Sequence, residues 1–435
     1  MAEKRSIVTV DWRRYGDFSA VGQLTKKIFS EVDNLDVYPI QVLDQEKCRF
    51  FRKKDNASIE ELVDWPIYQD AAINLIRNKP VACFYVRLSP HKSTLEFACK
   101  LACVFGNVPL VVHFMDTPHL GEMRESTSRY IMAMYNFLMA RADRVYTIHD
   151  SSVQWVENTY KRRAYVLGNF IKDSSFNKSK KGCARRINVS YFGSIDLKMN
   201  AAALISFARL VSKLDWAELS IWSNSGVWGE LKDLNEKKDN INVKDSHMSD
   251  EEYSKNIQQA DYLLLPYNID DSSVEFLKYS YSNKFIDYVE GRGKVICFGS
   301  PEIPSVRECI ESRVGIVVTS LDQLEAIFSS IESLSIASSE FYGANFENKR
   351  NEIKEKKYIF INEFKQYLSS LEVPGSGLGE RKVISNNNAN DISKNLEFLI
   401  KRKFFDKVTH KQSLAATISA CMLKSRGYRG FDYEV

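Results

Sequence analysis

The segment Tyr281–Asp287 (YSNKFID) carries a lysine and an aspartate three residues apart. The pattern predicts a short helix over 283–290 with Asn283 at or near its cap, so that Lys284 and Asp287 share one face. A cation in the first turn opposes the helix dipole, and a bound phosphate would remove that conflict. The carboxylate could accept hydrogen bonds from ribose hydroxyls. On chemistry alone, an exposed Lys–Asp helix pair is the simpler interpretation.

A glycine turn forms a second candidate site. The strand-like run Ile187–Phe192 is followed by Gly193 and Ser194, and then by a helical pattern from Asn200. Glycine lets the backbone approach a ligand, and a helix N-terminus offers N–H groups to a phosphate. A structural turn also explains the glycine. The sequence contains neither the GxGxxG nor the GxxxxGK[ST] phosphate-binding pattern.

A third candidate follows the strand-like run Leu110–Phe114, in the segment HFMDTPH at 113–119. Asp116 could act as a general base for an acceptor hydroxyl, and His113 could steady a sugar. Asp-Thr-Pro is equally ordinary turn and capping chemistry.

Gly16 and Asp17 follow the first predicted strand and could line a site facing a cleft, or simply form a permissive connection. No metal site is expected. The cysteines show no CxxC spacing, and Asp270-Asp271 is interpreted as loop.

Short apolar runs alternate with longer helical patterns, which predicts βαβ units and parallel sheets covered on both faces. Predicted strands are 6–10, 37–42, 81–86, 110–114, 144–148 and 163–167, then 187–192, 218–222, 241–243, 262–265, 294–298 and 314–318. Predicted helices are 20–32, 59–76, 93–104, 126–142, 200–214, 250–260, 283–290 and 321–331. Ligands of such sheets bind at the carboxyl ends of the strands, so two halves predict a site in a cleft between them.

The alternation divides the chain into parts. We expect an acceptor domain over 1–171, a polar linker over 172–186 and a donor-nucleotide domain over 187–345. A long charged helix over 346–372, which could pack back on the first domain, precedes a loop and helical extension over 373–435.

The bulk composition is that of a soluble globular chain. Of 435 residues, 60 are basic and 56 acidic, for a net charge of +4, which is too balanced to indicate nucleic-acid binding. The sequence shows no membrane span and no signal peptide, so we expect a cytoplasmic protein. The basic amphipathic pattern over 126–142 could touch the inner membrane face, although core packing is the more common reason for such a helix.

Six segments in the same order resemble known enzymes. They are Pro109–Asp116 (PLVVHFMD), Ala142–Ser151 (ADRVYTIHDS), Val166–Ile171 (VLGNFI), Val189–Ser194 (VSYFGS), Ala260–Tyr267 (ADYLLLPY) and Ser282–Phe298 (SNKFIDYVEGRGKVICF). With them the chain resembles the GT-B fold glycosyltransferases, in particular the large retaining-type group of bacterial polysaccharide and lipopolysaccharide enzymes. The stretch 266–288 also resembles the xanthan-type glucuronosyltransferases. The similarity covers roughly residues 6–371.

The resemblance implies two Rossmann-like, doubly wound parallel-sheet domains that face each other across a cleft, plus a C-terminal helical extension. It implies a UDP- or GDP-linked sugar as co-substrate, with no cofactor and no metal. It places the donor against Gly193, Ser194, Tyr281, Ser282, Asn283, Lys284 and Asp287, with Asp287 on the ribose and Lys284 near the diphosphate. If the enzyme inverts, Asp116 is the base, with His113 beside it. Three positions depart from the family pattern. Asp287 stands where the family usually has a glutamate, Tyr279 lies near the place of a usual acidic residue, and Ser194 stands where a basic residue often follows the glycine.

The expected function is therefore transfer of a sugar from a nucleotide-sugar to a hydroxyl of a glycan or lipid-linked acceptor, in bacterial surface polysaccharide synthesis. Two alternatives stay open: a sugar-nucleotide 2-epimerase of the same fold, and a non-catalytic scaffold in a polysaccharide assembly complex.

Overall fold

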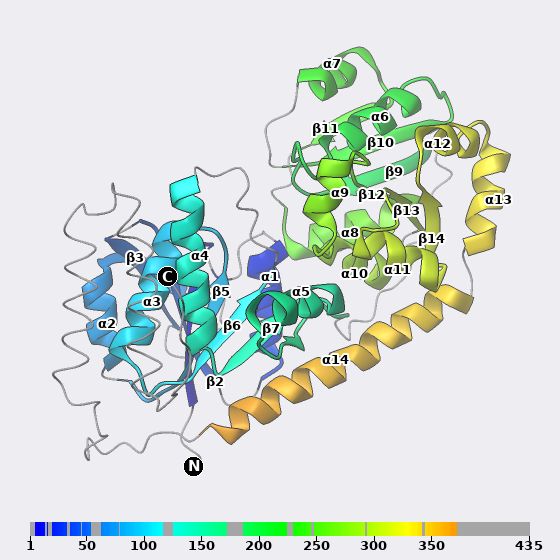
Figure 1. Ribbon diagram of the computed structural model, residues 1–435. Coiled ribbons are helices and arrows are strands. Elements are labelled where there is room, and N and C mark those ends of the chain that lie inside the picture. The colour runs from blue at the N-terminus through cyan, green and yellow to red at the C-terminus, as the bar shows by residue number, and fades with distance from the viewer. Residues whose placement is uncertain are drawn as a thin grey trace. The chain divides into compact units, whose positions relative to one another are not determined.

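The computed structural model describes residues 5–13, 15, 20–32, 35–44, 46–53, 62–77, 79–115, 125–171, 186–223, 229–244, 248–291, 294–341 and 344–371. The chain divides into two compact units (Figure 1). Unit 1 comprises 1–167 and 361–435, and unit 2 comprises 168–360. The first boundary falls at Leu167, four residues before the boundary expected at Ile171.

Unit 1 is built on an eight-stranded sheet of order β4-β3-β2-β1-β5-β6-β7-β8. The strands are β1 (Arg5–Asp11), β2 (Leu35–Val42), β3 (Lys47–Lys53), β4 (Leu62–Tyr68), β5 (Val81–Leu88), β6 (Leu110–Phe114), β7 (Arg144–Thr147) and β8 (Tyr165–Val166). All neighbouring pairs are parallel except β2–β3 and β3–β4. The strand order reverses between β1 and β5, which is where ligands bind in doubly wound sheets.

The helix expected over 59–76 is wrong in part, because an antiparallel edge strand occupies the middle of this range. Residues 62–68 form β4, and α2 (Gln69–Arg77) begins only at Gln69. Pro66 lies in the middle of the expected helix, where it would remove a backbone donor, whereas an edge strand tolerates it. Asp44 forms the turn between β2 and β3 by accepting hydrogen bonds from the backbone N–H groups of Glu46 (2.8 Å) and Lys47 (2.7 Å).

The remaining described helices of unit 1 are α1 (Ala20–Ser30), α3 (Lys92–Val104), α4 (Glu125–Arg141) and α5 (Asp150–Tyr160). All eight residues of β5 are buried, as expected for a central strand covered on both faces. On α4, Ile131, Tyr135 and Leu138 are buried in the core at helical spacing. The apolar face of α4 therefore packs inside unit 1.

Unit 2 is built on a six-stranded sheet of order β11-β10-β9-β12-β13-β14. The strands are β9 (Ile187–Phe192), β10 (Ala217–Trp222), β11 (Ile241–Lys244), β12 (Tyr262–Pro266), β13 (Lys294–Phe298) and β14 (Gly315–Val318), and every neighbouring pair is parallel. In chain order this is the Rossmann arrangement 3-2-1-4-5-6, with the switch point between β9 and β12.

The helices of unit 2 are α6 (Ala201–Val211), α7 (Gly229–Lys237), α8 (Asp250–Gln259), α9 (Asp271–Leu277), α10 (Asn283–Glu290), α11 (Pro304–Ser312), α12 (Leu321–Ile327) and α13 (Ile331–Phe341). The Asp270-Asp271 pair, expected to be loop, begins α9: the Asp270 carboxylate accepts a hydrogen bond from the Ser273 backbone N–H (3.0 Å). Aspartate is a preferred N-cap, so this helix start was readable from the residue type.

Helix α14 (Ala344–Ser370) contributes to both units. In unit 2, Lys349 is buried and pairs with Glu308 of α11 at 2.5 Å. In unit 1, the buried Phe364 packs edge-on against Phe29, Tyr85 and Tyr146. The end of the long helix thus forms part of the core of unit 1.

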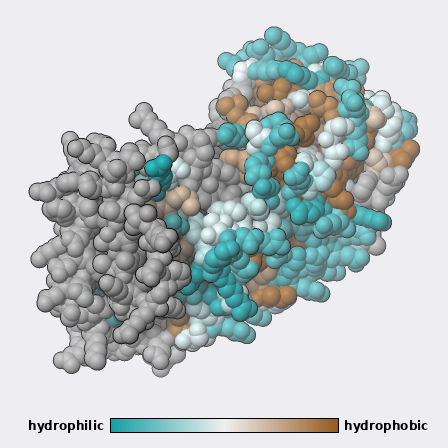
Figure 2. Space-filling view, in the orientation of Figure 1, coloured by the Kyte–Doolittle hydropathy of each residue, from teal (hydrophilic) through white to brown (hydrophobic). Residues whose placement is uncertain are grey.

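Hydrophilic residues cover much of the coloured surface in Figure 2, with apolar residues scattered among them. Leu197, Ile336 and Ile359 are among the exposed apolar side chains, and some apolar exposure is ordinary for folded proteins. Within the described ranges, no helix has the length and apolarity that a membrane crossing requires.

Candidate functional site

Gly193 lies at the switch point of unit 2, directly after β9. Its φ of +141° favours glycine, and its N–H donates to the Trp222 carbonyl (2.9 Å). A Cβ atom at this position would lie 2.6 Å from Lys284 Nζ and closer still to its Cε. The backbone after β9 and the lysine of α10, 91 residues further along the chain, are therefore in contact.

The Lys284 amine is a positive charge at this edge of the sheet. It lies 5.4 Å from the centre of the Tyr191 ring, and it makes no hydrogen bond or ion pair to a carboxylate within the described part of the chain. Burial lowers the pKa of Lys284 to about 8, and the nearby Asp287 charge opposes that shift. At neutral pH the amine is still mostly protonated.

Asp287, one turn further along α10, is held by two donors. Asn169 Nδ2 donates to Asp287 Oδ1 (3.1 Å), and the Tyr253 hydroxyl of α8 donates to Oδ2 (3.4 Å). Asn169 also donates to the Asn283 carbonyl (3.1 Å), while its own Oδ1 accepts from the Phe170 N–H (2.9 Å). The carboxylate is thus fixed in orientation on the same helix as Lys284.

The loop after β9 is held by a buried network. The Ser194 carbonyl accepts from the Tyr191 hydroxyl (2.5 Å) and from Asn200 Nδ2 (3.2 Å), and Asn200 Oδ1 accepts from the Asp196 N–H (2.9 Å). The side chain of Ser194 is exposed. These bonds fix the path of the backbone from Gly193 to α6.

The segment before α10 is anchored in the core. Tyr281 is buried and packs edge-on against Phe285, and burial together with the Glu308 carboxylate raises the pKa of its hydroxyl. The Ser282 N–H donates to Ser305 Oγ (2.9 Å). Asn283 Oδ1 is shielded from solvent and has no hydrogen-bond partner in the described ranges. Tyr281 therefore anchors the start of α10 by packing in the core.

The candidate residues of the first half are mostly outside the described ranges: Asp116, Gly16 and Asp17 all fall there. His113 is described. It is fully buried, and its Nδ1 contacts the Tyr85 hydroxyl. Burial, assisted by the Arg87 charge, lowers the pKa of His113 to about 3, so the imidazole is neutral at physiological pH.

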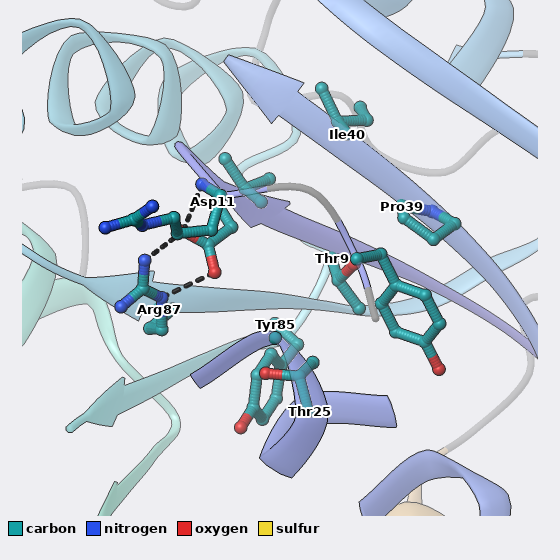
Figure 3. Close-up of a pocket in the computed structure, with 11 residues that line it drawn as sticks. Thr9, Asp11, Thr25, Pro39, Ile40, Tyr85 and Arg87 are labelled. Carbon is teal, nitrogen blue, oxygen red and sulfur yellow. Dashed lines mark hydrogen bonds and ion pairs between the residues drawn. The ribbon is translucent and has the colours of Figure 1, made fainter. Parts of the chain in front are cut away.

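The switch point of unit 1 carries a group that the sequence did not single out. Asp11, at the end of β1, pairs through both carboxylate oxygens with the guanidinium of Arg87 on β5 (Figure 3). Both side chains are largely buried. An arginine within the otherwise apolar strand VACFYVRL was the readable signal, because a buried charge requires a partner.

Known structures share this architecture. The chain is similar to sucrose-phosphate synthase from Thermosynechococcus elongatus, with 10% identity and a TM-score of 0.57 over 84% of this chain and 98% of that one. It is similar to an alpha,alpha-trehalose-phosphate synthase (UDP-forming) from Burkholderia xenovorans, with 8% identity and a TM-score of 0.53 over 84% and 100% of the two chains. It is also similar to TarM, with 11% identity and a TM-score of 0.51 over 75% and 64%. No protein-family model and no curated protein matches the sequence.

The chain has the GT-B glycosyltransferase fold. The expected fold class is confirmed at that level, with unit 2 as its fully parallel sheet and unit 1 carrying the antiparallel edge. Gly193, Lys284 and Asp287 come together at the switch point of unit 2, whereas Tyr281 is buried against Phe285. The roles of all the expected site residues stay predictions.

Sequence reasoning missed Asn169 and Tyr253, the two partners of Asp287. Asn169 lies in the segment VLGNFI, which carried part of the family resemblance, so a signal was present without a role. Tyr253 is an ordinary helix residue in the sequence. Across the described ranges, no cluster of three His, Cys, Asp or Glu side chains could hold a metal ion.

Proposed function

We propose that this protein transfers a sugar from a nucleotide diphosphate sugar to a hydroxyl of a glycan or lipid-linked acceptor. The observation that carries the proposal is the Lys284 amine beside Gly193 at the carboxyl ends of β9 and β12. Lys284 is partly buried and has no carboxylate partner among the described residues, and such a cation favours an anion as its partner, while a tight glycine turn lets the backbone approach one.

The donor would bind in two parts. Lys284 and the backbone at Gly193 would take the diphosphate, and the oriented Asp287 carboxylate would accept hydrogen bonds from the ribose hydroxyls. Binding in a site that excludes water would favour transfer over hydrolysis. UDP is the first nucleotide to test, because one structural neighbour is by name UDP-forming.

The chemistry at the acceptor belongs to the same proposal. If the reaction inverts the anomeric centre, Asp116 removes the proton of the acceptor hydroxyl; if it retains it, Asp116 and His113 orient the sugar instead. The proposal includes activity without a bound metal, since the Lys284 cation offsets diphosphate charge. It also includes a cytoplasmic location and a role in surface polysaccharide synthesis.

Calorimetry of the full chain against UDP- and GDP-linked sugars, followed by NMR of the products, tests this function. We expect binding of one donor and transfer of its sugar in the presence of EDTA. Binding followed by a change of configuration within the donor would indicate an epimerase, and no binding to any donor would indicate a scaffold. Folded Asp116→Ala and Asp287→Ala variants that transfer sugar at the parental rate would refute the assigned roles.

A further inference from the structure

The two central strands of unit 2 stop pairing before β9 ends. Among the described residues, the ladder between β9 and β12 ends at the pair Ser190–Leu263. On the other side of β9, the ladder with β10 continues to Phe192, the last residue of the strand. The backbone of β9 therefore loses its β12 partner at the switch point, where the strand order reverses.

A tyrosine hydroxyl lies where this ladder would have continued. Successive N–H groups of a strand point to opposite neighbours, and the Gly193 N–H bonds to β10, so the Phe192 N–H points to β12. In the same register, a parallel ladder would join the Phe192 N–H to the Leu264 carbonyl. Instead, the Phe192 N–H donates to the Tyr288 hydroxyl (3.3 Å), which donates to the Leu264 carbonyl (3.5 Å). The hydroxyl thus stands in for one ladder bond.

The state of this hydroxyl suits a bridge. Tyr288 is fully buried, and burial raises the pKa of its hydroxyl well above the ordinary value for tyrosine. The hydroxyl therefore keeps its proton, and it can accept one hydrogen bond while it donates another. Both backbone groups are satisfied in this way although the strands do not pair, which matters because a shielded backbone group without a partner is unfavourable.

The same helix face carries the cation of the proposed donor site. Tyr288 and Lys284 are four residues apart on α10, so their side chains are neighbours on the helix surface. The Tyr288 hydroxyl holds the backbone of Phe192, and the Lys284 amine lies against the next residue, Gly193. On its other side, the Gly193 N–H donates to the Trp222 carbonyl (2.9 Å). The backbone at Gly193 is therefore held between α10 and β10.

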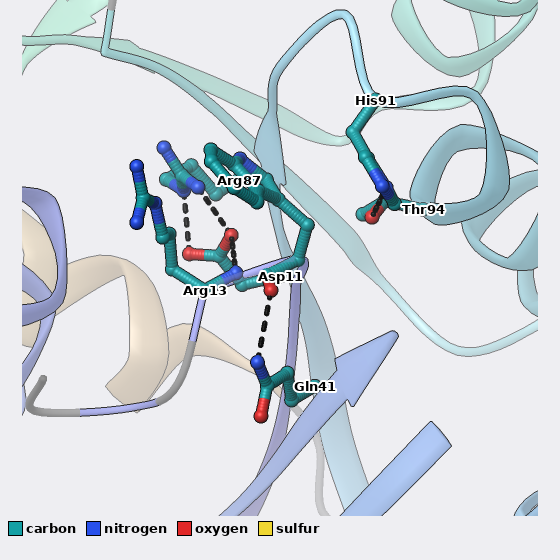
Figure 4. A network of polar contacts seen from close by, with 7 residues as sticks. Asp11, Arg13, Gln41, Arg87, His91 and Thr94 are labelled. Atoms are coloured by element: carbon teal, nitrogen blue, oxygen red, sulfur yellow. Dashed lines mark hydrogen bonds and ion pairs between the residues drawn. The ribbon is translucent and has the colours of Figure 1, made fainter. Parts of the chain in front are cut away.

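Unit 1 joins its central strands in another way. Its ladder between β1 and β5 continues to the pair Val10–Val86, one residue before β1 ends. The next residue, Asp11, pairs through its carboxylate with the guanidinium of Arg87, so charged side chains connect the two strands (Figure 4). Unit 2 uses a neutral hydroxyl from a helix instead, and a neutral group does not compete with a phosphate for a nearby cation.

We propose that Tyr288 is a positioning residue of the donor site. Its hydroxyl keeps the ends of β9 and β12 apart, so that the Gly193 backbone and the Lys284 amine can contact one diphosphate. Without the hydroxyl, the Phe192 N–H would have the Leu264 carbonyl as its nearest remaining acceptor, and the ladder would extend by one bond. Gly193 would then move toward β12 and change its contact with Lys284. The inference rests on the proposed function, because this spacing matters only if a diphosphate binds.

The variant Tyr288→Phe tests the inference, because it keeps the buried ring and removes only the hydroxyl. Calorimetry of the full chain with UDP and with pyrophosphate measures the effect, and GDP replaces UDP if the parent binds that nucleotide instead. We expect both ligands to bind about 10-fold more weakly, by the same factor, since the carboxylate of Asp287 is unchanged. In a Lys284→Met background, Tyr288→Phe should remove less than about 3-fold, because the two groups act together.

The matched control is Tyr262→Phe. Tyr262 is also a buried tyrosine of unit 2, and its hydroxyl is hydrogen-bonded to the Ser338 side chain. It is the first residue of β12, so it lies at the opposite end of the strand from the switch point. Each variant loses a hydroxyl from the core, and both should unfold at a lower temperature than the parent. Tyr262→Phe should bind UDP and pyrophosphate as the parent does.

Each outcome has a separate meaning. Parental affinity of Tyr288→Phe for both ligands, even with a lower melting temperature, overturns the inference and leaves the proposed function standing. An equal loss of affinity in Tyr262→Phe also overturns it, because that loss would indicate general loosening of unit 2. A loss for UDP alone overturns it too, since the hydroxyl would then act on the nucleoside part. Absence of nucleotide binding by the parent refutes the proposed function, and the inference falls with it.

Discussion

Replacing Gly193 with alanine tests the donor site most directly. At a φ of +141° an L-residue is strained, which costs on the order of 1–3 kcal/mol. The new methyl group would overlap the end of the Lys284 side chain, with Nζ only 2.6 Å from the Cβ position. That end is flexible, so it can move aside at little cost in stability, but the amine then leaves the switch point.

We therefore expect two separate effects. Thermal unfolding should occur at a lower temperature, by about 2–4 °C for each kcal/mol in a unit of this size. The affinity for UDP should fall by about 10-fold or more, because a charge-assisted bond to phosphate contributes on the order of 1.5–3 kcal/mol. Differential scanning fluorimetry measures the first effect, and calorimetry with UDP measures the second.

Gly229→Ala is the control in the same unit. A Cβ atom there meets nothing within 4 Å, and Gly229 is the first residue of α7, so alanine should leave stability equal or slightly higher. The reasoning about Gly193 is refuted if Gly193→Ala matches Gly229→Ala in both melting temperature and UDP affinity.

Four further predictions concern Lys284, Asn169 and Phe364. The affinity of the parent for UDP should fall as pH rises through about 8, which is the pKa of Lys284. Lys284→Met should bind UDP weakly and show no such step. Calorimetry at several pH values measures both affinities. Because the unfolded lysine binds its proton up to a higher pH than the folded one, the stability of the free parent should rise relative to Lys284→Met between about pH 8 and 10.5; a fall would contradict the assignment. Asn169→Ala should weaken UDP binding by about 10-fold while pyrophosphate binds as before, since the variant removes a donor to Asp287 Oδ1, together with the bond to the Asn283 carbonyl, and leaves Gly193 and Lys284 unchanged; equal losses for both ligands would argue against a ribose role. Phe364→Ala should destabilise unit 1 by about 3–5 kcal/mol in denaturant unfolding, because a fully buried ring that touches three aromatic rings is removed; a cost below 1 kcal/mol would show that the end of α14 is dispensable.

Much of unit 2 was predictable because its information is local. The strands at 187–192 and 294–298 and the helix at 283–290 have the predicted bounds, since buried parallel strands are continuous apolar runs and helix ends carry their own signals. The edge of unit 1 was harder. Strands β3 and β4 are antiparallel neighbours, and the pattern over 59–76 resembles a helix although Pro66 disfavours one.

The sequence alone determined the α/β class, the two-part organisation and the placement of Lys284 and Asp287 on one face of a helix, because each depends on periodicity or on spacing within one element. Only the tertiary structure decided what meets these residues. Asn169 reaches Asp287 across 118 positions and Arg87 reaches Asp11 across 76, and such contacts are set by strand order rather than by any local pattern. Strand order also explains the contact of Gly193. Strand β12 lies beside β9 in the sheet, so that α10, which follows β12 in the chain, places Lys284 against Gly193. In the sequence, Lys284 looks like an ordinary surface lysine. In the fold it is a partly buried cation that faces backbone, because the carboxyl ends of the strands in a doubly wound sheet lie at one edge.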